Sequence, residues 1–149
     1  MHKEKLVTEI IEKIKRAEET GNYDFIWQDS LKRRLAWYEK NKDKLELDGS
    51  EVKKAYTILL LNYMGLDSKE VPVVYEDERK IVWKSFSWCP VLEACKRANF
   101  DTREVCKKGW EKSVQEFVKK INPKIKFSRN YEKIRPHAEY CEETFELVE

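Results

Sequence analysis

The sequence predicts an α+β protein in which an N-terminal three-helix segment precedes a small antiparallel sheet packed with two further helices. Three observations predict this class. Apolar residues recur at helical spacing over the first 66 residues, two later stretches are rich in alternating β-branched and aromatic residues, and helical spacing returns between them. Two hairpins supply about four strands, and helices then cover the resulting sheet.

The composition is typical of a folded chain with a dense surface of both charges. The 149 residues include 30 Lys+Arg and 28 Asp+Glu, and aromatic residues make up 12%. Intrinsic disorder is not expected, because disordered chains combine few aromatic residues with a large net charge. The longest apolar run, residues 58–61, is far shorter than the roughly 20 residues of a membrane span, so no membrane partner is expected. The many charges also resemble the surface of a thermophilic protein.

The first 66 residues are expected to form three amphipathic helices with short connections. The first covers residues 3–20 and the second about residues 24–44. The apolar stripe of the second helix consists of Trp27, Leu31, Leu35 and Tyr38. The third helix follows Asp48 and Glu51, which have capping-box spacing, and ends before Gly65, a typical C′ residue.

The chain is predicted to form a single domain, residues 1–149, with two lobes. No internal repeat and no linker-like stretch marks a domain boundary. At Leu66 the pattern changes from helical to β-branched and aromatic. This step divides a helical lobe, residues 1–66, from a cysteine-containing α+β lobe, residues 67–149.

The second lobe is predicted to contain two hairpins with two helices between them. The first hairpin joins residues 71–75 and 81–88, and Pro72 indicates that its first strand begins there or lies at a sheet edge. A short helix begins at Pro90, and a longer helix over residues 101–120 opens with capping-box spacing. The strands of the second hairpin are expected at residues 124–131 and 137–148.

All four cysteines lie in the last 61 residues: Cys89, Cys95, Cys106 and Cys141. The N-terminus lacks the apolar region of a secretory signal, so we expect a cytoplasmic protein with free thiols rather than disulfides. Structural zinc sites use closely spaced cysteine pairs, and the spacing C-x5-C-x10-C-x34-C contains none. We therefore predict no metal site. If a metal does bind, the ligands are expected to be Cys89, Cys106, Cys141 and His137.

The last predicted strand places an unusual set of side chains on one face. His137, Glu139, Cys141, Glu143, Phe145 and Leu147 share one parity. Either a bulge changes this parity, or the core face opens into a polar pocket, because buried carboxylates need partners. A pocket would bring a thiol and an imidazole together, as in a cysteine nucleophile with its base. The candidate catalytic residues on this strand are therefore Cys141, His137 and Glu139. Cys89, where a strand meets a helix, and Cys106, on the apolar face of its helix, are candidates for the same pocket, against the alternative that these cysteines pack as small hydrophobes.

The charges of the C-terminal third are segregated by sign. Residues 119–135 carry seven Lys/Arg and one Glu, whereas residues 137–149 carry five Glu and no Lys or Arg. Strands of opposite sign would pair favourably as neighbours in the sheet. A nucleic-acid partner is not expected, because the isoelectric point is about 8.2 and no reading motif is present. Arg129 and Arg135 are alternatively suited to hold a carboxylate ligand through bidentate contacts.

The tryptophans of the first hairpin suggest a sheet that is covered on both sides. Trp83 and Trp88 have opposite parity in the strand expected at residues 81–88. One of them would then point to each side of the sheet. Helices or a second subunit must cover both faces, so a homodimer is an expected arrangement.

Three cysteine settings in this half resemble a known family. The segments are Trp88–Cys95, Asp101–Cys106 and Glu139–Phe145, where a Cys-Pro begins a short helix, a Cys lies early in the next helix and a Cys precedes a Phe. Over about residues 80–148 the chain resembles the L-2-amino-thiazoline-4-carboxylic acid hydrolase-like family. The resemblance implies hydrolytic opening of a cyclic aminothiazoline carboxylate and carries a cysteine nucleophile over to Cys89, Cys106 and Cys141. The layout also resembles a small-molecule-sensing 4-vinyl-reductase type of domain, which implies a binding module.

These features predict a cytoplasmic protein with a cysteine-containing small-molecule pocket, and they leave open whether it is an enzyme. Hydrolase-like thiol chemistry is the first interpretation. A non-catalytic ligand- or metal-binding sensor module is the second, and a structural dimerising protein is the third. No cofactor is indicated, because four glycines without a Gly-rich motif practically exclude a nucleotide-cradling loop.

Overall fold

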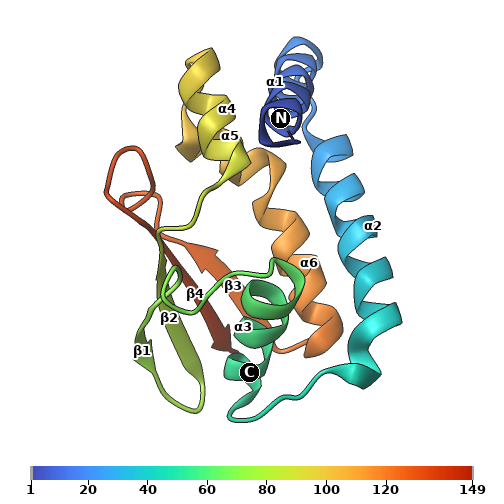
Figure 1. Ribbon diagram of the computed structural model, residues 1–149, viewed down its shortest axis with the longest axis vertical. Helices are drawn as coiled ribbons and strands as arrows, with labels where there is room; N and C mark the ends of the chain where they lie inside the picture. Colours follow the sequence, from blue (N-terminus) through green and yellow to red (C-terminus); the bar gives the residue numbers. More distant parts are fainter. Residues whose placement is uncertain (1, 149) are drawn as a thin grey trace.

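The computed structural model describes residues 2–148, over which six α-helices pack with one four-stranded antiparallel sheet (Figure 1). This arrangement confirms the predicted α+β class. Within the described residues, no helix combines the length and apolar character that crossing a membrane requires.

The three predicted N-terminal helices are present. They are α1 (His2–Thr20), α2 (Asp24–Asn41) with a short 3-10 turn η1 (Lys42–Lys44), and α3 (Glu51–Tyr56). Asp48 is not the cap of α3, because the hydroxyl of Ser50 accepts the Lys53 backbone N–H. Beyond Tyr56 the helix widens into a π-helix, η2 (Thr57–Tyr63), and Gly65 follows it with the expected positive φ of 66°.

The sheet has the strand order β1-β2-β4-β3, with every neighbouring pair antiparallel. The strands are β1 (Val73–Glu76), β2 (Lys80–Ser85), β3 (Ile125–Arg129) and β4 (Cys141–Leu147). Strand β1 starts directly after Pro72 and lies at an edge of the sheet, as predicted. Each predicted hairpin is present, and β2 joins the two hairpins by pairing with β4.

The outer face of the sheet carries many charged side chains, which are ordered by strand pairing. On this face Glu146 of β4 lies between Lys80 of β2 and Lys126 of β3, and Glu142 lies opposite Lys84. Strand β3 from the basic segment and strand β4 from the acidic segment are thus neighbours in the sheet, which confirms the pairing interpretation. The prediction of two apolar faces is wrong, because β2 ends before Trp88 and only Trp83 lies on the strand, where it is buried.

The helix predicted over residues 101–120 is divided into two. A first short helix, α4 (Pro90–Ala98), is followed by α5 (Thr102–Gly109) and α6 (Glu111–Ile121). Trp110 between α5 and α6 leaves the helical region, with φ −132°. The two halves pack against different partners: Val105 of α5 joins a cluster with α1 and α4, whereas Phe117 of α6 packs on the sheet. Tertiary packing thus overrides a continuous helical pattern.

The N-cap of α5 leads to a prediction about stability. The Asp101 carboxylate accepts the Arg103 backbone N–H at 2.9 Å, and hydrogen bonding to the Arg103 side chain and backbone lowers its pKa to about 2. Asp101→Ala should lower the free energy of unfolding by about 1 kcal/mol in urea titrations at neutral pH. The folded-state pKa is depressed, so the charge-dependent part of this contribution is fully present above pH 3.8 and disappears as the pH falls through about 2.

Asp101→Asn is the matched control for this prediction, because asparagine also caps helices but carries no charge. It should retain most of the stability at neutral pH and lose its acid dependence. Equal losses for the alanine and asparagine variants would show that the cap hydrogen bond contributes nothing.

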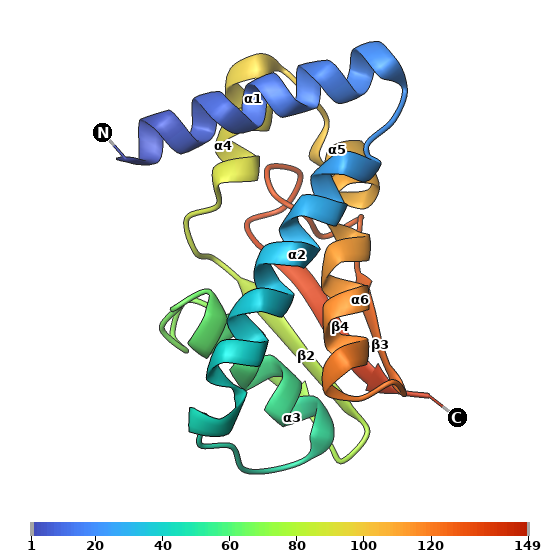
Figure 2. The same cartoon turned by 90° about the vertical axis from the view of Figure 1, so that its right-hand side faces the viewer.

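The buried residues form two clusters, and both combine residues from before and after Leu66. The first packs α3, η2 and α6 onto the inner sheet face. There the ring centre of Trp83 lies 4.8 Å from that of Phe145 and 5.5 Å from that of Tyr56. The second joins α1, the start of α2, α4 and α5. Figure 2 shows α2 running from the second cluster, at the top of the view, down along α6 toward α3.

The buried line of α2 differs from the predicted stripe. Ile26, Ser30 and Arg34 are buried, whereas the expected Trp27, Leu31, Leu35 and Tyr38 are only partly so. Ser30 faces α6, where its hydroxyl oxygen lies 3.1 Å from that of Ser113. Small side chains at this contact let the two helices approach closely. Arg34 follows Ser30 by about one helical turn and lies on the same buried line of α2.

Candidate functional site

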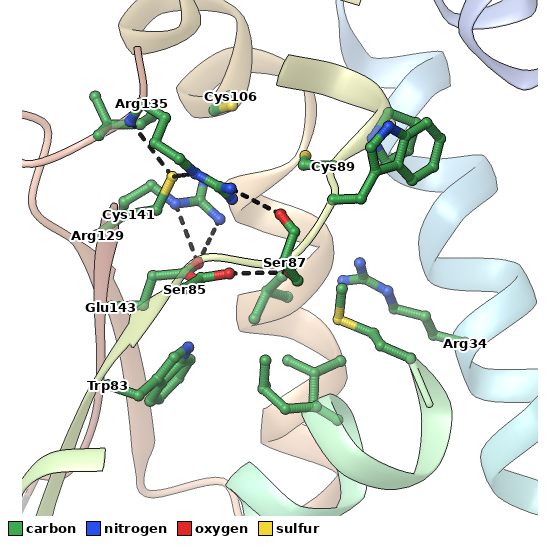
Figure 3. A pocket seen from close by; sticks show the side chains of 17 residues that line it. Arg34, Trp83, Ser85, Ser87, Cys89, Cys106, Arg129, Arg135, Cys141 and Glu143 are labelled. Carbon is green, nitrogen blue, oxygen red and sulfur yellow. Dashed lines mark hydrogen bonds and ion pairs between the residues drawn. The ribbon is translucent and has the colours of Figure 1, made fainter. Parts of the chain in front are cut away.

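A cavity of about 140 Å³ lies between the inner sheet face and helices α2, η2 and α6 (Figure 3). Its polar lining consists of Arg34, Ser85, Ser87, Cys89, Cys106, Arg129, Arg135, Cys141 and Glu143. Its apolar lining consists of Leu59, Leu60, Met64, Trp83, Trp88, Pro90, Val114 and Ile134. Met64 and Trp88 are also exposed, which places them at its opening.

The cavity forms where the inner face of the sheet changes from apolar to polar. The inward residues read Ile81, Trp83, Ser85 along β2, Phe127, Arg129 along β3, and Phe145, Glu143, Cys141 along β4. Strand β4 keeps its register with both neighbours, so no bulge changes its parity. Of the two alternatives for this strand, the polar pocket is therefore the correct one.

Arg129 and Glu143 form a buried ion pair in the cavity wall. Arg129 donates from Nη2 at 2.6 Å and from Nε at 3.1 Å to Oε2 of Glu143, and each side chain is 12% exposed. Burial alone would lower the pKa of Arg129, but the Glu143 carboxylate raises it above its ordinary value. Each side chain thus supplies the opposite charge that its buried partner needs.

Arg34 is the functional candidate that sequence reasoning missed. Its side chain enters the cavity from α2 and the residue is only 9% exposed, and this burial lowers its pKa. Its guanidinium carbon lies 5.7 Å from the ring centre of Tyr63. Within the run Lys32-Arg33-Arg34 it resembles a solvated charge. Its spacing of four from Ser30 and eight from Ile26 was the available signal.

Four buried side-chain nitrogens in this part of the molecule have no hydrogen-bond acceptor. They are Nε and Nη1 of Arg34, Nη1 of Arg129 and Nε1 of Trp83, and they are the only such side-chain atoms found over residues 2–148. All three residues line the same cavity. Every one of these groups is a donor. Buried donors are normally paired, so their concentration at one place indicates a site for an acceptor.

Arg135 and Cys141 form a second polar contact at the cavity. The guanidinium of Arg135 donates from Nη1 to the Ser87 carbonyl oxygen at 2.7 Å and from Nε to Sγ of Cys141 at 3.4 Å. The Arg135 backbone N–H also points to this sulfur, at 3.5 Å. Thr102 fixes the loop by donating its hydroxyl to the Arg135 carbonyl oxygen at 2.7 Å. The thiol of Cys141 is therefore held beside a positive charge.

The other three thiols are not activated by their surroundings. All four cysteines are free, and Cys89 and Cys106 line the cavity together with Cys141. Burial raises the pKa of the Cys89 thiol, and it raises the pKa values of Cys95 and Cys106 to about 12. Cys95 lies outside the cavity in the second cluster. A thiol with a raised pKa is a poor source of thiolate.

Two of the predicted catalytic residues lie elsewhere. Strand β4 begins at Cys141 rather than at residue 137, because the segment before it forms turns that include a cis Arg135–Pro136 peptide. His137 is exposed at another cleft, with its Nε2 3.2 Å from Oδ1 of Asp101. Glu139 is exposed as well. The structure thus brings together Cys89, Cys106, Cys141 and Glu143 but not His137 or Glu139.

The four side chains expected to act as ligands if a metal binds are not brought together either. Over residues 2–148 no three His, Cys, Asp or Glu side chains are arranged to hold a metal ion. The three cavity cysteines lack His137 as a fourth partner, because that side chain belongs to the cleft beside Asp101.

Comparisons of this chain with family models, curated proteins and solved structures found no significant match. The site is therefore interpreted from its own geometry and charges.

Proposed function

We propose that this protein binds a small organic carboxylate in the cavity and is a ligand-binding module. One observation carries the proposal: the four unpaired buried donors all belong to residues that line this one cavity, Arg34, Arg129 and Trp83. An ionised carboxylate is an acceptor-only group with about four lone-pair positions, so it matches a site that offers only donors. Charge-assisted bonds of this kind are roughly twice as strong as neutral ones.

The charges around the cavity favour an anion as the ligand. Arg34, Arg129 and Arg135 contribute three positive charges, and Glu143 contributes one negative charge that pairs with Arg129. A buried cation is costly unless it is paired. A ligand carboxylate at Arg34 would supply the missing partner, which is the physical reason for an otherwise unfavourable residue at this position.

The remaining lining selects a compact apolar body. Leu59, Leu60, Val114 and Ile134 supply aliphatic surface, and Trp83 adds an aromatic ring. An engineered apolar cavity of about 150 Å³ binds benzene, so about 140 Å³ suits a group the size of one six-membered ring. We therefore propose an aromatic or branched aliphatic monocarboxylate as the ligand class.

A titration of matched acids and amides tests this proposal. Benzoate, phenylacetate and 3-methylbutanoate are expected to shift the NMR signals of the Trp83 indole N–H and the Arg34 Nε–H. The corresponding primary amides should bind at least about tenfold more weakly, since a charge-assisted hydrogen bond contributes about 1.5–3 kcal/mol. Equal binding of acids and amides, or shifts confined to surface residues, would contradict it.

Thiol-dependent hydrolysis is a second candidate function, in line with the resemblance to the aminothiazoline carboxylate hydrolase-like family. One observation favours it: Cys141 and Glu143 face the same cavity from neighbouring inward positions of β4. In such a reaction the thiol would act as the nucleophile and the carboxylate as the general base.

An assay with 2-amino-thiazoline-4-carboxylate separates the two functions. Water adds at C2 of the ring, and either the C2–S or the ring C2–N bond then breaks, so the product is an N-carbamoyl or S-carbamoyl amino acid that mass spectrometry detects by the gain of one water. Product formation that Cys141→Ser abolishes would identify a hydrolase. Saturable binding without either product would identify a binding module.

A further inference from the structure

We infer that Cys141 is a modification site for small carboxylic acids that carry a leaving group on the carbon next to the carboxylate. This inference rests on the proposed carboxylate binding and goes beyond it, because it assigns one of four thiols as a nucleophile and names the class of reagent that it takes.

The position of Cys141 distinguishes its thiol from the other three. Its sulfur receives the Arg135 Nε–H and backbone N–H, and the Arg135 guanidinium is itself fixed by the Ser87 carbonyl oxygen. A fixed positive charge beside the sulfur is the setting in which reactive cysteines are found. Cys89 and Cys106 share the cavity but have no hydrogen bond from an arginine side chain among the described contacts.

An independent observation indicates that anions enter the space in front of this sulfur. Arg34 is 9% exposed, its side chain enters the cavity from α2 as Figure 3 shows, and its buried Nε and Nη1 have no acceptor. Arg129 also lines this cavity, and its Nη1 is likewise buried without an acceptor. Charges of one sign in a low-dielectric cleft raise the local concentration of the oppositely charged reagent.

The reaction is a simple displacement. The sulfur of Cys141 forms a bond to the carbon that bears the leaving group, and the bond from that carbon to the leaving group breaks. With iodoacetate the leaving group is iodide, the thiol proton passes to solvent and the product is a carboxymethyl thioether. No electron transfer is involved, and the acid itself is the sole co-reactant.

Alkylation rates with iodoacetate and iodoacetamide test the inference, because the two reagents differ mainly in charge. The rate at each cysteine is measured by peptide mass spectrometry on the folded chain and again on the chain unfolded in guanidinium chloride. For Cys141 the ratio of the iodoacetate rate to the iodoacetamide rate should be at least about tenfold higher in the folded chain than in the unfolded chain. A tenfold change corresponds to about 1.4 kcal/mol. Cys95, buried outside the cavity, is the internal reference and should show no such preference.

Two arginine variants provide the controls. Arg34→Met should reduce the preference of Cys141 for iodoacetate, whereas Arg33→Met, which removes an exposed neighbour paired with Asp29, should leave it unchanged. Arg34→Lys keeps the charge and should retain most of the preference, which guards against a folding defect in the methionine variant. A ratio near one at Cys141, or faster labelling at Cys89 or Cys106, would overturn the inference. If benzoate binds while Cys141 shows no preference, only this inference fails, whereas an absence of benzoate binding removes the proposed function itself.

Discussion

Glu143→Ala is expected to lower the free energy of unfolding by about 3–5 kcal/mol, the largest loss from any single polar substitution considered for this chain. The variant leaves the Arg129 guanidinium in the cavity wall without its anion, because it removes the carboxylate that accepts hydrogen bonds at 2.6 and 3.1 Å between two side chains that are each only 12% exposed. Desolvation then acts on Arg129 without the compensating attraction that now raises its pKa. Urea titration followed by circular dichroism measures the effect.

Glu146→Ala is the matched control for this substitution. Glu146 lies on the same strand but on the exposed outer face, opposite Lys80 and Lys126. Exposed pairs contribute about 0–1 kcal/mol, so its removal should change stability little. Similar losses for the two variants would mean that the Arg129–Glu143 pair contributes no more than a surface ion pair.

Much of the fold could be predicted from local patterns. Helical and alternating periodicities located all the strands and most of the helix ends, and Pro72 and Gly65 marked real boundaries. These features depend on short-range sequence, where period and turn chemistry decide the structure. The break at Trp110 does not. It exists because α5 and α6 pack in two different clusters, and its one local signal is Gly109, the residue at which α5 ends.

The candidate site was predictable only in part, and the reasons differ between its residues. Parity along the last strand correctly placed Cys141 and Glu143 on the core face, because strand alternation is a local property. His137 was included by extending that strand too far, into a segment that instead forms turns before β4. Arg34 was missed because the side of α2 that is buried includes the polar Ser30, whose contact with Ser113 joins residues 83 positions apart and leaves no local signal.

Arg34 illustrates how stability and ligand binding can oppose each other in this fold. Natural proteins often retain locally unfavourable groups at binding sites and compensate for them elsewhere. The unpaired donors of Arg34, Arg129 and Trp83 are unfavourable in the protein alone, yet two well-packed clusters surround the cavity. Substitutions in the cavity should therefore be able to raise the free energy of unfolding while weakening ligand binding.

Arg34→Met is expected to raise the free energy of unfolding while abolishing carboxylate binding. Each unsatisfied buried donor costs about 1–3 kcal/mol, and an apolar side chain of similar length removes this cost from the 9% exposed position. A net gain of about 1–3 kcal/mol is therefore expected in urea titration without ligand. Affinity for benzoate should fall by roughly 10- to 100-fold, because the charge-assisted bonds to Arg34 are lost. Arg33→Met, at the exposed neighbouring position, should change neither quantity appreciably. If Arg34→Met instead loses stability and still binds benzoate, Arg34 is a structural residue whose stem packs against Tyr63, and the anion must be held by other groups.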